Sequence, residues 1–565
     1  MSSMPERLAM REPGHELGES KHMYVGMSDG VRLKTHVWLP DGAGPWPTLF
    51  VRNPYVDGSD SGDPSLLQFV RYGYAVVLQE CRGRGASEGV WEPYANERQD
   101  GIDALRWLVS QPWQDGNIGL YGGSYLGFTQ WIVADILPPE VKTMYACVMG
   151  TDLQRFAYMN GMFRHDIYTS WSLTNAGVDW SSRDMGEVAY EAYGYRPHAE
   201  MDQALFGRKL DWYEGVVTHP SPADPYWEDG VRGLLKAMPG KVDVPICLVG
   251  GWFDIALDTM FESYRALRED VREKSRFVVG PWTHAIAPDG DLDYPNGWVD
   301  GTNGGTKAVL AWFDHTLKGM PYAEELGVVH AYTIGEGEWQ DWREWPLSSL
   351  KQQYFLSGES GLSLATAVPG IAKSASYKYD PNDPVVTVGS SCLLNVYGRE
   401  PYWPKNASVK QPEPGYRQDL LSFVSEPLER SIRIAGNVSV TLHVASTAED
   451  TAFTVKLIEV LPNGEAYNIV DGIASLAYRN GAAAPLGYAP GAIERIRIEL
   501  WPIAWRISSG SRIRLDVSSS NYPAYHAHPN VAGDWARQEN VREAWQTVYW
   551  GTNFPSFIEL PTDFS

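Results

Sequence analysis

Cysteine and long apolar runs are both scarce in this sequence. The 565 residues include four cysteines, which lie far apart and form no C-x-x-C pair: Cys81, Cys147, Cys247 and Cys392. A zinc cluster is therefore not expected, and buried, unreactive thiols are favoured over catalytic ones. No stretch approaches the ~18 consecutive apolar residues of a membrane-spanning helix, and the first residues lack the apolar core of a secretory signal. We expect a cytoplasmic protein without a membrane partner.

Basic residues are outnumbered by acidic ones. Lys and Arg total 47 and Asp and Glu total 70, which gives a formal net charge of −23. An acidic surface repels nucleic-acid phosphates and anionic lipids, so neither is expected as a partner. Hydrophobic residues make up 44% and charged residues 21%, as in ordinary globular proteins. The length predicts two to four domains rather than one core.

The first part of the chain alternates short apolar runs with amphipathic stretches. Residues 1–20 are polar and are expected to form a loose arm, followed by a β-hairpin around Asp29 and Gly30. Strands are then expected at residues 48–52, 74–79 and 118–121, and helices at residues 66–72, 98–110 and 125–136. This alternation is typical of a parallel sheet with helices on both faces.

The pattern changes twice farther along. Residues 151–240 are dense in aromatic and acidic side chains and predict a mostly helical cap, after which strands at 244–250 and 276–279 and a helix at 307–317 resume the alternation. Beyond residue 350, short alternating runs predict a β-sandwich or jelly roll, with strands at residues 431–434, 438–444, 453–460, 496–500 and 511–517. We therefore expect an α/β domain (1–150 and 241–350), a cap (151–240) and a β domain (351–565).

The sharpest chemical signal is the segment GGSYLG at residues 122–127. It follows an expected strand and opens an expected helix, which is the setting of a nucleophilic serine on a tight turn with small neighbours. The amide of Tyr125, directly after Ser124, would then point at a developing oxyanion. The common pattern is G-x-S-x-G, whereas here Leu126 stands at the second position after the serine. A structural turn with an idle serine therefore remains an alternative.

A nucleophilic serine needs a base and a residue that orients the base. Two further strand ends offer them in the order expected for this arrangement, Asp254 after residues 244–250 and His284 after residues 276–279. Asp258 is an alternative acid, one helical turn farther on. The competing histidines are His165, His198 and His219 in the cap, His315 in a helix, and His526 and His528 in the β domain, where a metal would need a third ligand.

A second oxyanion donor is not evident from the residues alone. Tyr55 follows the expected strand at residues 48–52 and carries a hydroxyl that could donate to an oxyanion. From the residues alone, a tyrosine packed in a loop is the favoured interpretation of its position, and the oxyanion donor is the alternative.

Together these segments resemble the family of cocaine esterases, X-Pro dipeptidyl-peptidases and α-amino-acid ester hydrolases, and most of all its cocaine-esterase-like branch. The resemblance runs from about residue 23 to the end and is carried by RNPY (52–55), RGRGASEG (82–89), GGSYLG (122–127), GWFD (251–254), GPWTH (280–284), WFD (312–314) and LKG (317–319). It implies an α/β-hydrolase fold with a C-terminal jelly roll and no cofactor. It also implies that Ser124, Asp254 and His284 form a catalytic triad, and that the Tyr55 hydroxyl and the Tyr125 amide form the oxyanion hole.

The segment after Asp254 indicates a class of substrate. Amino-acid ester hydrolases of this family place acids there to hold the substrate ammonium, whereas this chain has an uncharged Ile-Ala-Leu segment at residues 255–257. We expect cleavage of an ester or amide of a small neutral acyl substrate through an acyl-enzyme, in a pocket lined by cap aromatics such as Trp171 and Phe163. A cap carboxylate, Asp152 or Asp166, could still bind an ammonium.

Three other functions and the oligomeric state stay open. Two share the scaffold, an X-Pro-type exopeptidase and an α-amino-acid ester or β-lactam acylase. The third is a carbohydrate-binding or adhesion protein that acts through its β domain. Homo-oligomer formation is also left open by the sequence.

Overall fold

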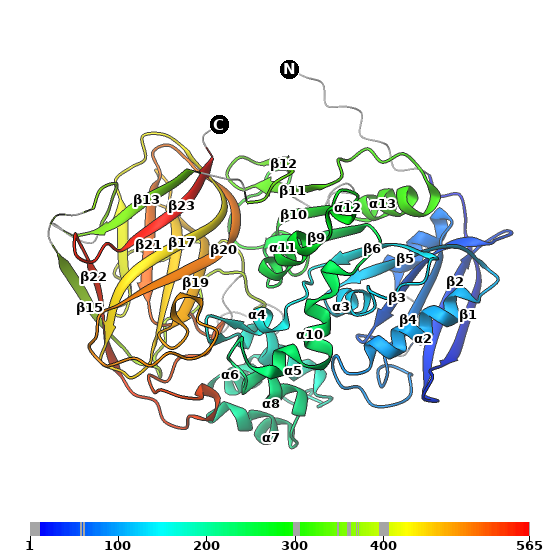
Figure 1. Ribbon diagram of the computed structural model, residues 1–565, viewed down its shortest axis with the longest axis horizontal. Helices are drawn as coiled ribbons and strands as arrows, with labels where there is room; N and C mark the ends of the chain where they lie inside the picture. The colour runs from blue at the N-terminus through cyan, green and yellow to red at the C-terminus, as the bar shows by residue number, and fades with distance from the viewer. Residues whose placement is uncertain are drawn as a thin grey trace.

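The protein is described by a computed structural model that covers residues 12–56, 59, 63–297, 305–346, 350–358, 363–368, 370, 372–394 and 406–563. Within these ranges the chain forms a large mixed sheet with helices, a helical region and a β-sandwich (Figure 1). Among the described residues, no helix is long and apolar enough to cross a membrane.

The mixed sheet occupies one half of the molecule (Figure 1). Its described strands follow the spatial order β1-β2-β4-β3-β5-β6-β9-β10-β11-β12, parallel from β4 to β11 and antiparallel at both edges. Their bounds are β1 Leu17–Gly26, β2 Arg32–Pro40, β3 Trp46–Asn53, β4 Ala75–Glu80, β5 Gln114–Gly123, β6 Val141–Cys147, β9 Ile246–Phe253, β10 Arg276–Thr283, β11 Val328–Thr333 and β12 Glu338–Trp342. Every residue of β4, β9 and β10 is buried, as expected of strands covered on both faces.

Helices cover both faces of this sheet, as the alternating sequence predicted. Neighbouring residues of β3 face different cores: Phe50 packs with α2 and α3, whereas Leu49 packs with the segment η1 and helix α13. The helices around the sheet are α1 Pro64–Leu67, η1 Gln68–Tyr72, α2 Glu97–Val109, α3 Tyr125–Trp131, α11 Leu257–Ala266, α12 Glu269–Arg272 and α13 Thr306–Lys318. The α/β-hydrolase fold class predicted from the sequence is confirmed.

Two local expectations were wrong. The arm does not stay loose up to residue 20, because Leu17 already pairs with Pro40 across the β1–β2 hairpin; residues 1–11 lie outside the described part. The helix expected at residues 125–136 ends at Trp131, and the chain continues in tighter turns in which the amide of Ala134 bonds the carbonyl of Trp131.

The chain between β6 and β9 is mostly helical and lies below the sheet in Figure 1. It contains α4 Leu153–Ala157, α5 Ser170–Asn175, α6 Met185–Gly194, α7 Met201–Phe206, α8 Asp211–Val217, α9 Pro225–Glu228 and α10 Gly230–Lys236, with the short turns η2 His165–Thr169, η3 His198–Glu200 and η4 Met238–Gly240 and the hairpin β7 Tyr158–Met159 and β8 Met162–Phe163. We call this region the cap.

The last part of the chain is a β-sandwich on the left of Figure 1. Its described strands are β13 Leu350–Ser357, β14 Ser363–Ala365, β15 Lys373–Tyr379, β16 Leu421–Ser425, β17 Ile432–Ser446, β18 Ala452–Val460, β19 Ala466–Ser475, β20 Glu494–Ile507, β21 Arg512–Ser518, β22 Ala544–Trp550 and β23 Phe557–Asp563. The two runs expected at 431–434 and 438–444 are one strand, β17. A bulge between Asn437 and Ser439, beside Gly436 with φ 138°, interrupts its alternating pattern.

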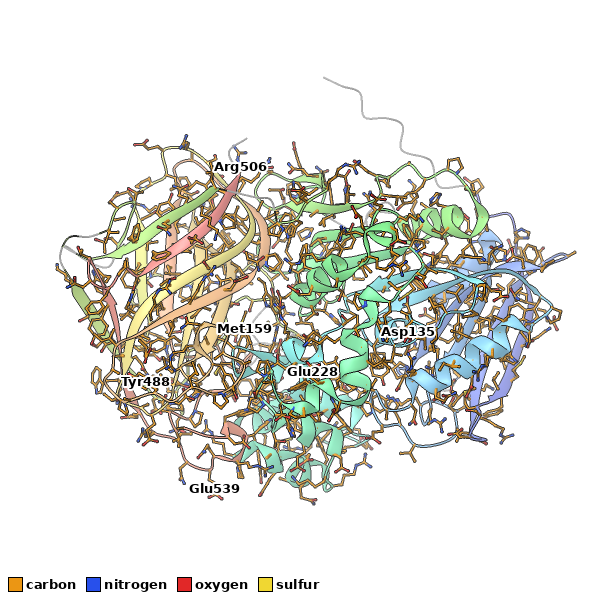
Figure 2. All side chains as sticks on the ribbon, in the orientation of Figure 1. Asp135, Met159, Glu228, Tyr488, Arg506 and Glu539 are labelled. Carbon is orange, nitrogen blue, oxygen red and sulfur yellow. The ribbon has the colours of Figure 1, made fainter. Side chains whose placement is uncertain are left out.

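The cap and the sandwich meet near Met159, which is labelled in Figure 2. The side chain of Asn160 donates to the carbonyl of Ile473 at 3.0 Å, and the hydroxyl of Tyr525 contacts the sulfur of Met159 at 3.2 Å. The guanidinium of Arg164 donates to a backbone carbonyl of the sandwich segment. These contacts attach the sandwich to the cap through buried polar groups as well as apolar packing.

Candidate active site

Ser124 occupies the sharp turn between strand β5 and helix α3. Its backbone has φ 55° and ψ −125°, a conformation that residues with side chains rarely adopt. The turn can close because of its glycines: a Cβ atom on Gly122 would lie only 2.5 Å from the Cβ of Leu126. A Cβ on Gly127 would lie 2.9 Å from the Cβ of Met149. The glycine three positions after the serine therefore lets α3 approach the segment after β6, which accounts for the departure from G-x-S-x-G.

Two further strand ends bring an acid and a histidine to Ser124. His284 Nε2 lies 3.0 Å from Ser124 Oγ, and His284 Nδ1 lies 2.8 Å from Asp254 Oδ1. Asp254 is fully buried, and the amide of Ala256 donates to the same carboxylate oxygen at 3.2 Å. A carboxylate beside Nδ1 favours a proton on that nitrogen, which leaves Nε2 to accept from the serine hydroxyl. The three side chains thus form the row that nucleophilic catalysis by serine requires.

The other acids considered from the sequence are engaged elsewhere. Asp258 lies in a different cavity and forms an ion pair with Arg155 at 2.6 Å. Asp166 is buried in a pair with Arg164 at 2.8 Å, and Asp152 caps helix α4 by accepting from two of its amides. Neither cap carboxylate is among the described residues that line the cavity at the serine, so the structure does not support the alternative that one of them binds an ammonium there.

Three of the competing histidines lie together between the cap and the sandwich. The ring centroids of His165 and His198 are 4.6 Å apart, and those of His165 and His526 are 6.5 Å apart. Burial, the largest cause, lowers the pKa of all three, that of His198 to about 3. The others pack or pair elsewhere: His219 on Tyr226, His315 on Tyr322 and His528 with Asp450. No group of three or more His, Cys, Asp or Glu among the described residues is arranged to hold a metal.

Ser124 and His284 open into a small cavity of about 40 Å³. Its lining is mostly aromatic and otherwise aliphatic: Tyr55, Tyr94, Tyr125, Phe128, Phe156, Tyr168 and Trp171, with Met149, Ile167, Ile255 and Leu393. Trp171 therefore lies where the sequence analysis expected it. Phe163 does not, because the β7–β8 hairpin carries its ring toward the sandwich, where it stacks on Trp535 at 5.2 Å. No carboxylate is among the described residues that line the cavity.

Tyr55 and Tyr125 approach this cavity from different elements. Tyr55 follows β3, and its hydroxyl accepts a hydrogen bond from the indole N–H of Trp171 at 3.1 Å. Tyr125 is the first residue of α3, so its amide is one of the N–H groups that have no acceptor within the helix. The Tyr125 hydroxyl is held separately: it donates to Glu97, and burial raises the pKa of both the phenol and the carboxyl.

Several lining residues were missed by sequence reasoning. Phe128 lies one helical turn after Ser124 on α3, so helical spacing alone could have found it. Tyr94 and Tyr168 come from segments without a periodic pattern. The backbone of Tyr94 has φ 70°, and its amide donates to the Tyr125 hydroxyl at 2.8 Å. This contact joins segments about 30 residues apart, so no local sequence pattern could have predicted it.

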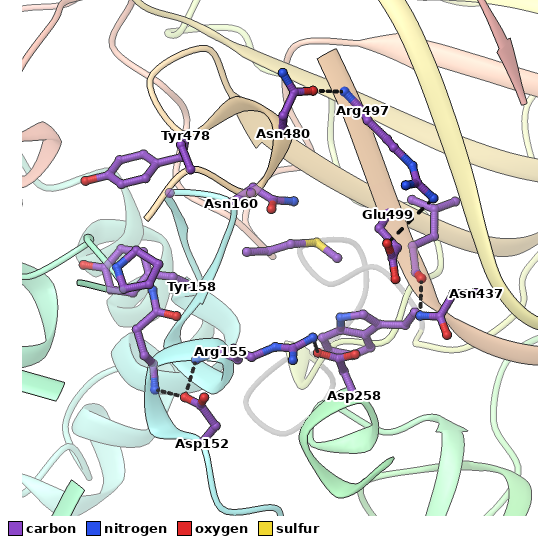
Figure 3. Close-up of a pocket in the computed structure, with 18 of the residues that line it drawn as sticks. Asp152, Arg155, Tyr158, Asn160, Asp258, Asn437, Tyr478, Asn480, Arg497 and Glu499 are labelled. Atoms are coloured by element: carbon purple, nitrogen blue, oxygen red, sulfur yellow. Dashed lines mark hydrogen bonds and ion pairs between the residues drawn. The ribbon is translucent and has the colours of Figure 1, made fainter. Parts of the chain in front are cut away.

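A second, much larger cavity of about 730 Å³ lies where α4, α11 and the sandwich meet. Figure 3 shows the side chain of Arg155 reaching toward Asp258, with Glu499 and Arg497 on the opposite wall. Lys236 pairs with Asp152 at 3.6 Å on the same lining. This cavity is thus polar, and these charges are compensated within the protein.

Comparison with known proteins identifies the family of this chain. The family model of the X-Pro dipeptidyl-peptidases (S15 family) matches residues 29–286, and the model of the X-Pro dipeptidyl-peptidase C-terminal non-catalytic domain matches residues 322–559. A cocaine esterase of Rhodococcus sp. (strain MB1 Bresler) is 32% identical over 96% of this chain and 98% of its own. The chain belongs to the X-Pro dipeptidyl-peptidase (S15) family. This S15-family chain is a serine hydrolase, and the resemblance stated from its motifs is confirmed.

Solved structures show the same fold over the whole length. An aminopeptidase from the marine sediment archaeon Thaumarchaeota archaeon superposes with a TM-score of 0.84 at 22% identity, covering 100% of this S15-family chain and 99% of its own. An α-amino acid ester hydrolase superposes with a TM-score of 0.80 at 22% identity, covering 100% of both chains. At 22% identity, both comparisons show the fold and do not identify the substrate.

Proposed function

We propose that Ser124 is the nucleophile, His284 its general base and Asp254 the residue that orients His284. The observation that carries this is the row of hydrogen-bonding distances, 3.0 Å from serine to histidine and 2.8 Å from histidine to aspartate. Ser124 Oγ attacks the carbonyl carbon while its proton passes to His284 Nε2, which then protonates the leaving group as its bond to carbon breaks. Water repeats the sequence on the acyl-enzyme and releases the acid.

The negative charge that develops on the carbonyl oxygen needs donors fixed in advance. The Tyr55 hydroxyl and the Tyr125 amide are the groups we assign to it. Because the Tyr55 oxygen accepts from Trp171, its own hydrogen is directed toward a different acceptor. The Tyr125 amide is held by the start of α3, and the buried contact of its side chain with Glu97 fixes that residue in place.

The substrate we propose is a small ester with a neutral acyl group. The described lining around Ser124 is aromatic and aliphatic and contains no carboxylate, so it gains from burying apolar surface. An ammonium group placed there would lose its hydration without gaining a partner. The cocaine esterase at 32% identity supports an ester as the scissile group. The alternative is an X-Pro-type exopeptidase, as in the name of the family model, or an enzyme that cleaves α-amino-acid esters or β-lactams.

A matched pair of substrates tests this proposal. We expect the value of kcat/KM for ethyl phenylacetate to exceed that for the ethyl ester of phenylglycine, which differs by one ammonium group. Ser124→Ala, purified in parallel, must abolish both activities for the comparison to report on this site. A clear preference for the phenylglycine ester would instead assign the chain to amino-acid ester hydrolysis.

The three-part division of the chain is also a proposal. The sheet and its helices up to about residue 350, the cap at 151–240 and the sandwich from 351 onward support it. The two family models divide the chain only once, between residues 286 and 322. A cytoplasmic location stays a prediction from the sequence, and the oligomeric state stays open.

A further inference from the structure

One arginine of the loop after strand β4 has no carboxylate partner. Arg84 is partly buried; its Nε donates to the carbonyl of Pro54 at 2.6 Å, and its guanidinium lies over the Trp91 ring at 4.6 Å. Among the described residues, the two terminal nitrogens of this guanidinium form no hydrogen bond and no ion pair. Arg82, two residues earlier, is instead paired with Asp100 at 2.6 Å. The Arg84 guanidinium is thus held in place by one nitrogen and by its stacking, with two nitrogens left to bind a ligand.

No carboxylate among the described residues neutralises the charge of Arg84. Burial, the largest cause, lowers the pKa of this arginine, and the groups that counteract it are the phenols of Tyr55 and Tyr125 and the thiol of Cys81. Tyr125 and Cys81 stay protonated at neutral pH, because burial raises the pKa of the phenol and brings that of the thiol to about 12. Partly buried charges are normally paired. In a chain with a net charge of −23, an unpaired cation of this kind indicates a site for an anion.

This arginine lies at the open side of the small aromatic cavity. Of the described residues that line the cavity, Tyr55 is the only exposed one, at 44%. The carbonyl that Arg84 holds belongs to Pro54, directly before Tyr55. The Trp91 ring under the guanidinium lies 5.4 Å from the ring of Trp171, which is part of the lining. A cavity of about 40 Å³ holds only part of an ester, so the remainder extends past Tyr55 and comes close to the guanidinium.

We propose that Arg84 binds a carboxylate on the alcohol part of the substrate, so that the preferred esters join a small neutral acyl group to an anionic alcohol. This rests on the proposed function of the Ser124 site, in which the uncharged cavity takes the acyl group. A guanidinium forms paired, charge-assisted hydrogen bonds with a carboxylate. A carboxylate on the acyl group would instead be buried in the cavity, where the described lining contains no lysine or arginine.

Two matched pairs of esters test the proposal on either side of the scissile bond. The alcohol-side pair is 3-(4-acetoxyphenyl)propanoate against 3-(4-acetoxyphenyl)propanamide, which release phenols of similar acidity. The acyl-side pair is ethyl 4-(carboxymethyl)phenylacetate against ethyl 4-(carbamoylmethyl)phenylacetate. We expect kcat/KM to favour the carboxylate by roughly 10-fold in the alcohol-side pair, the scale of one hydrogen bond to a charged group, and not in the acyl-side pair. In Arg84→Gln the alcohol-side preference should fall to about 1.

The preference is a ratio within one protein, so a general loss of activity in a variant cancels. Arg106→Gln is the matched control, because it removes an exposed arginine of helix α2 outside the described lining, and it should keep the preference. If Arg84→Gln does not fold, Arg84→Lys and Arg84→Met decide: the preference should survive in the lysine variant and vanish in the methionine variant. An equal loss on both alcohol-side esters, with the ratio unchanged, would make Arg84 a support of the loop and overturn the proposal.

The proposal and the proposed function fail in different ways. If the wild-type enzyme shows no alcohol-side preference, or favours the carboxylate of the acyl-side pair instead, the role of Arg84 is wrong. Ester hydrolysis that still depends on Ser124 would in that case leave the proposed function standing. Failure of the proposed function would appear as hydrolysis of the two uncharged esters that survives Ser124→Ala.

Discussion

Helix α4 separates two cavities of opposite character. Phe156 faces the small cavity at Ser124, about 40 Å³, whereas its neighbour Arg155 lines the cavity of about 730 Å³. Successive residues of a helix point about 100° apart, so one short helix can serve both walls. The small cavity is aromatic, and the large one is lined by paired charges. The larger cavity is not the one that we propose as the active site, because its charges are paired within the protein, whereas the proposed triad opens into the smaller cavity.

The largest expected difference between the two cavities is in the effect on kcat of replacing two aspartates that are four residues apart. Asp254 faces His284, and Asp258 faces Arg155 in the large cavity. We expect Asp254→Asn to lower kcat by about 10⁴, because the histidine loses the carboxylate that sets its tautomer. Asp258→Asn is the matched control and should change kcat less than about twofold, within the scatter expected of a site remote from the chemistry. Similar losses in both variants would erase the distinction between the cavities.

The next effect concerns the tyrosine hydroxyls of the two cavities. Tyr55→Phe should lower kcat by roughly 10²–10³ with little change in KM, the scale for loss of one oxyanion donor. Tyr478→Phe makes the same chemical change in the lining of the large cavity and should leave kcat unchanged. A change in KM alone for Tyr55→Phe would indicate that Tyr55 packs against substrate and does not stabilise the oxyanion.

A third region, the buried histidines between cap and sandwich, extends the comparison to stability. The pKa of His198 is lowered to about 3 by burial, from an ordinary value of 6.5. Below pH 6.5 the unfolded chain therefore binds a proton that the folded chain refuses, and stability is lost as the pH falls. Each such histidine contributes about 1.4 kcal/mol per pH unit. We expect Tm to fall increasingly below pH 6.5 and the fall to be shallower in His198→Gln. An unchanged slope in that variant would contradict the assignment.

The smallest expected effect on kcat comes from replacing Trp171, which acts through the Tyr55 hydroxyl. Trp171→Phe keeps the aromatic wall and removes the N–H that donates to Tyr55. We expect kcat to fall several-fold, about the worth of one neutral hydrogen bond, with KM nearly unchanged. In the Tyr55→Phe background the same substitution should have almost no effect, because the hydroxyl it orients is gone. Equal effects in both backgrounds would show that Trp171 acts on the substrate directly.

The sequence predicted the residues that end regular elements and missed those placed by packing. Ser124, Asp254 and His284 each follow a buried strand, and the carboxyl ends of parallel strands share one edge of a sheet, so their meeting could be expected. Phe163 was expected at the pocket and lies against Trp535 instead, because the direction of the β7–β8 hairpin depends on contacts with the distant sandwich. Tyr168 was missed for the same reason. Aromatic composition predicts that a cap has a core but not which rings face the substrate.

Covalent labelling with a fluorophosphonate, followed by mass analysis of the peptides, tests the central claim most directly. The account predicts one phosphonyl group on Ser124, no label in Ser124→Ala, slow labelling in Asp254→Asn and labelling at the normal rate in Asp258→Asn. A label on another residue, or a Ser124→Ala protein that reacts as fast as the wild type, would contradict it.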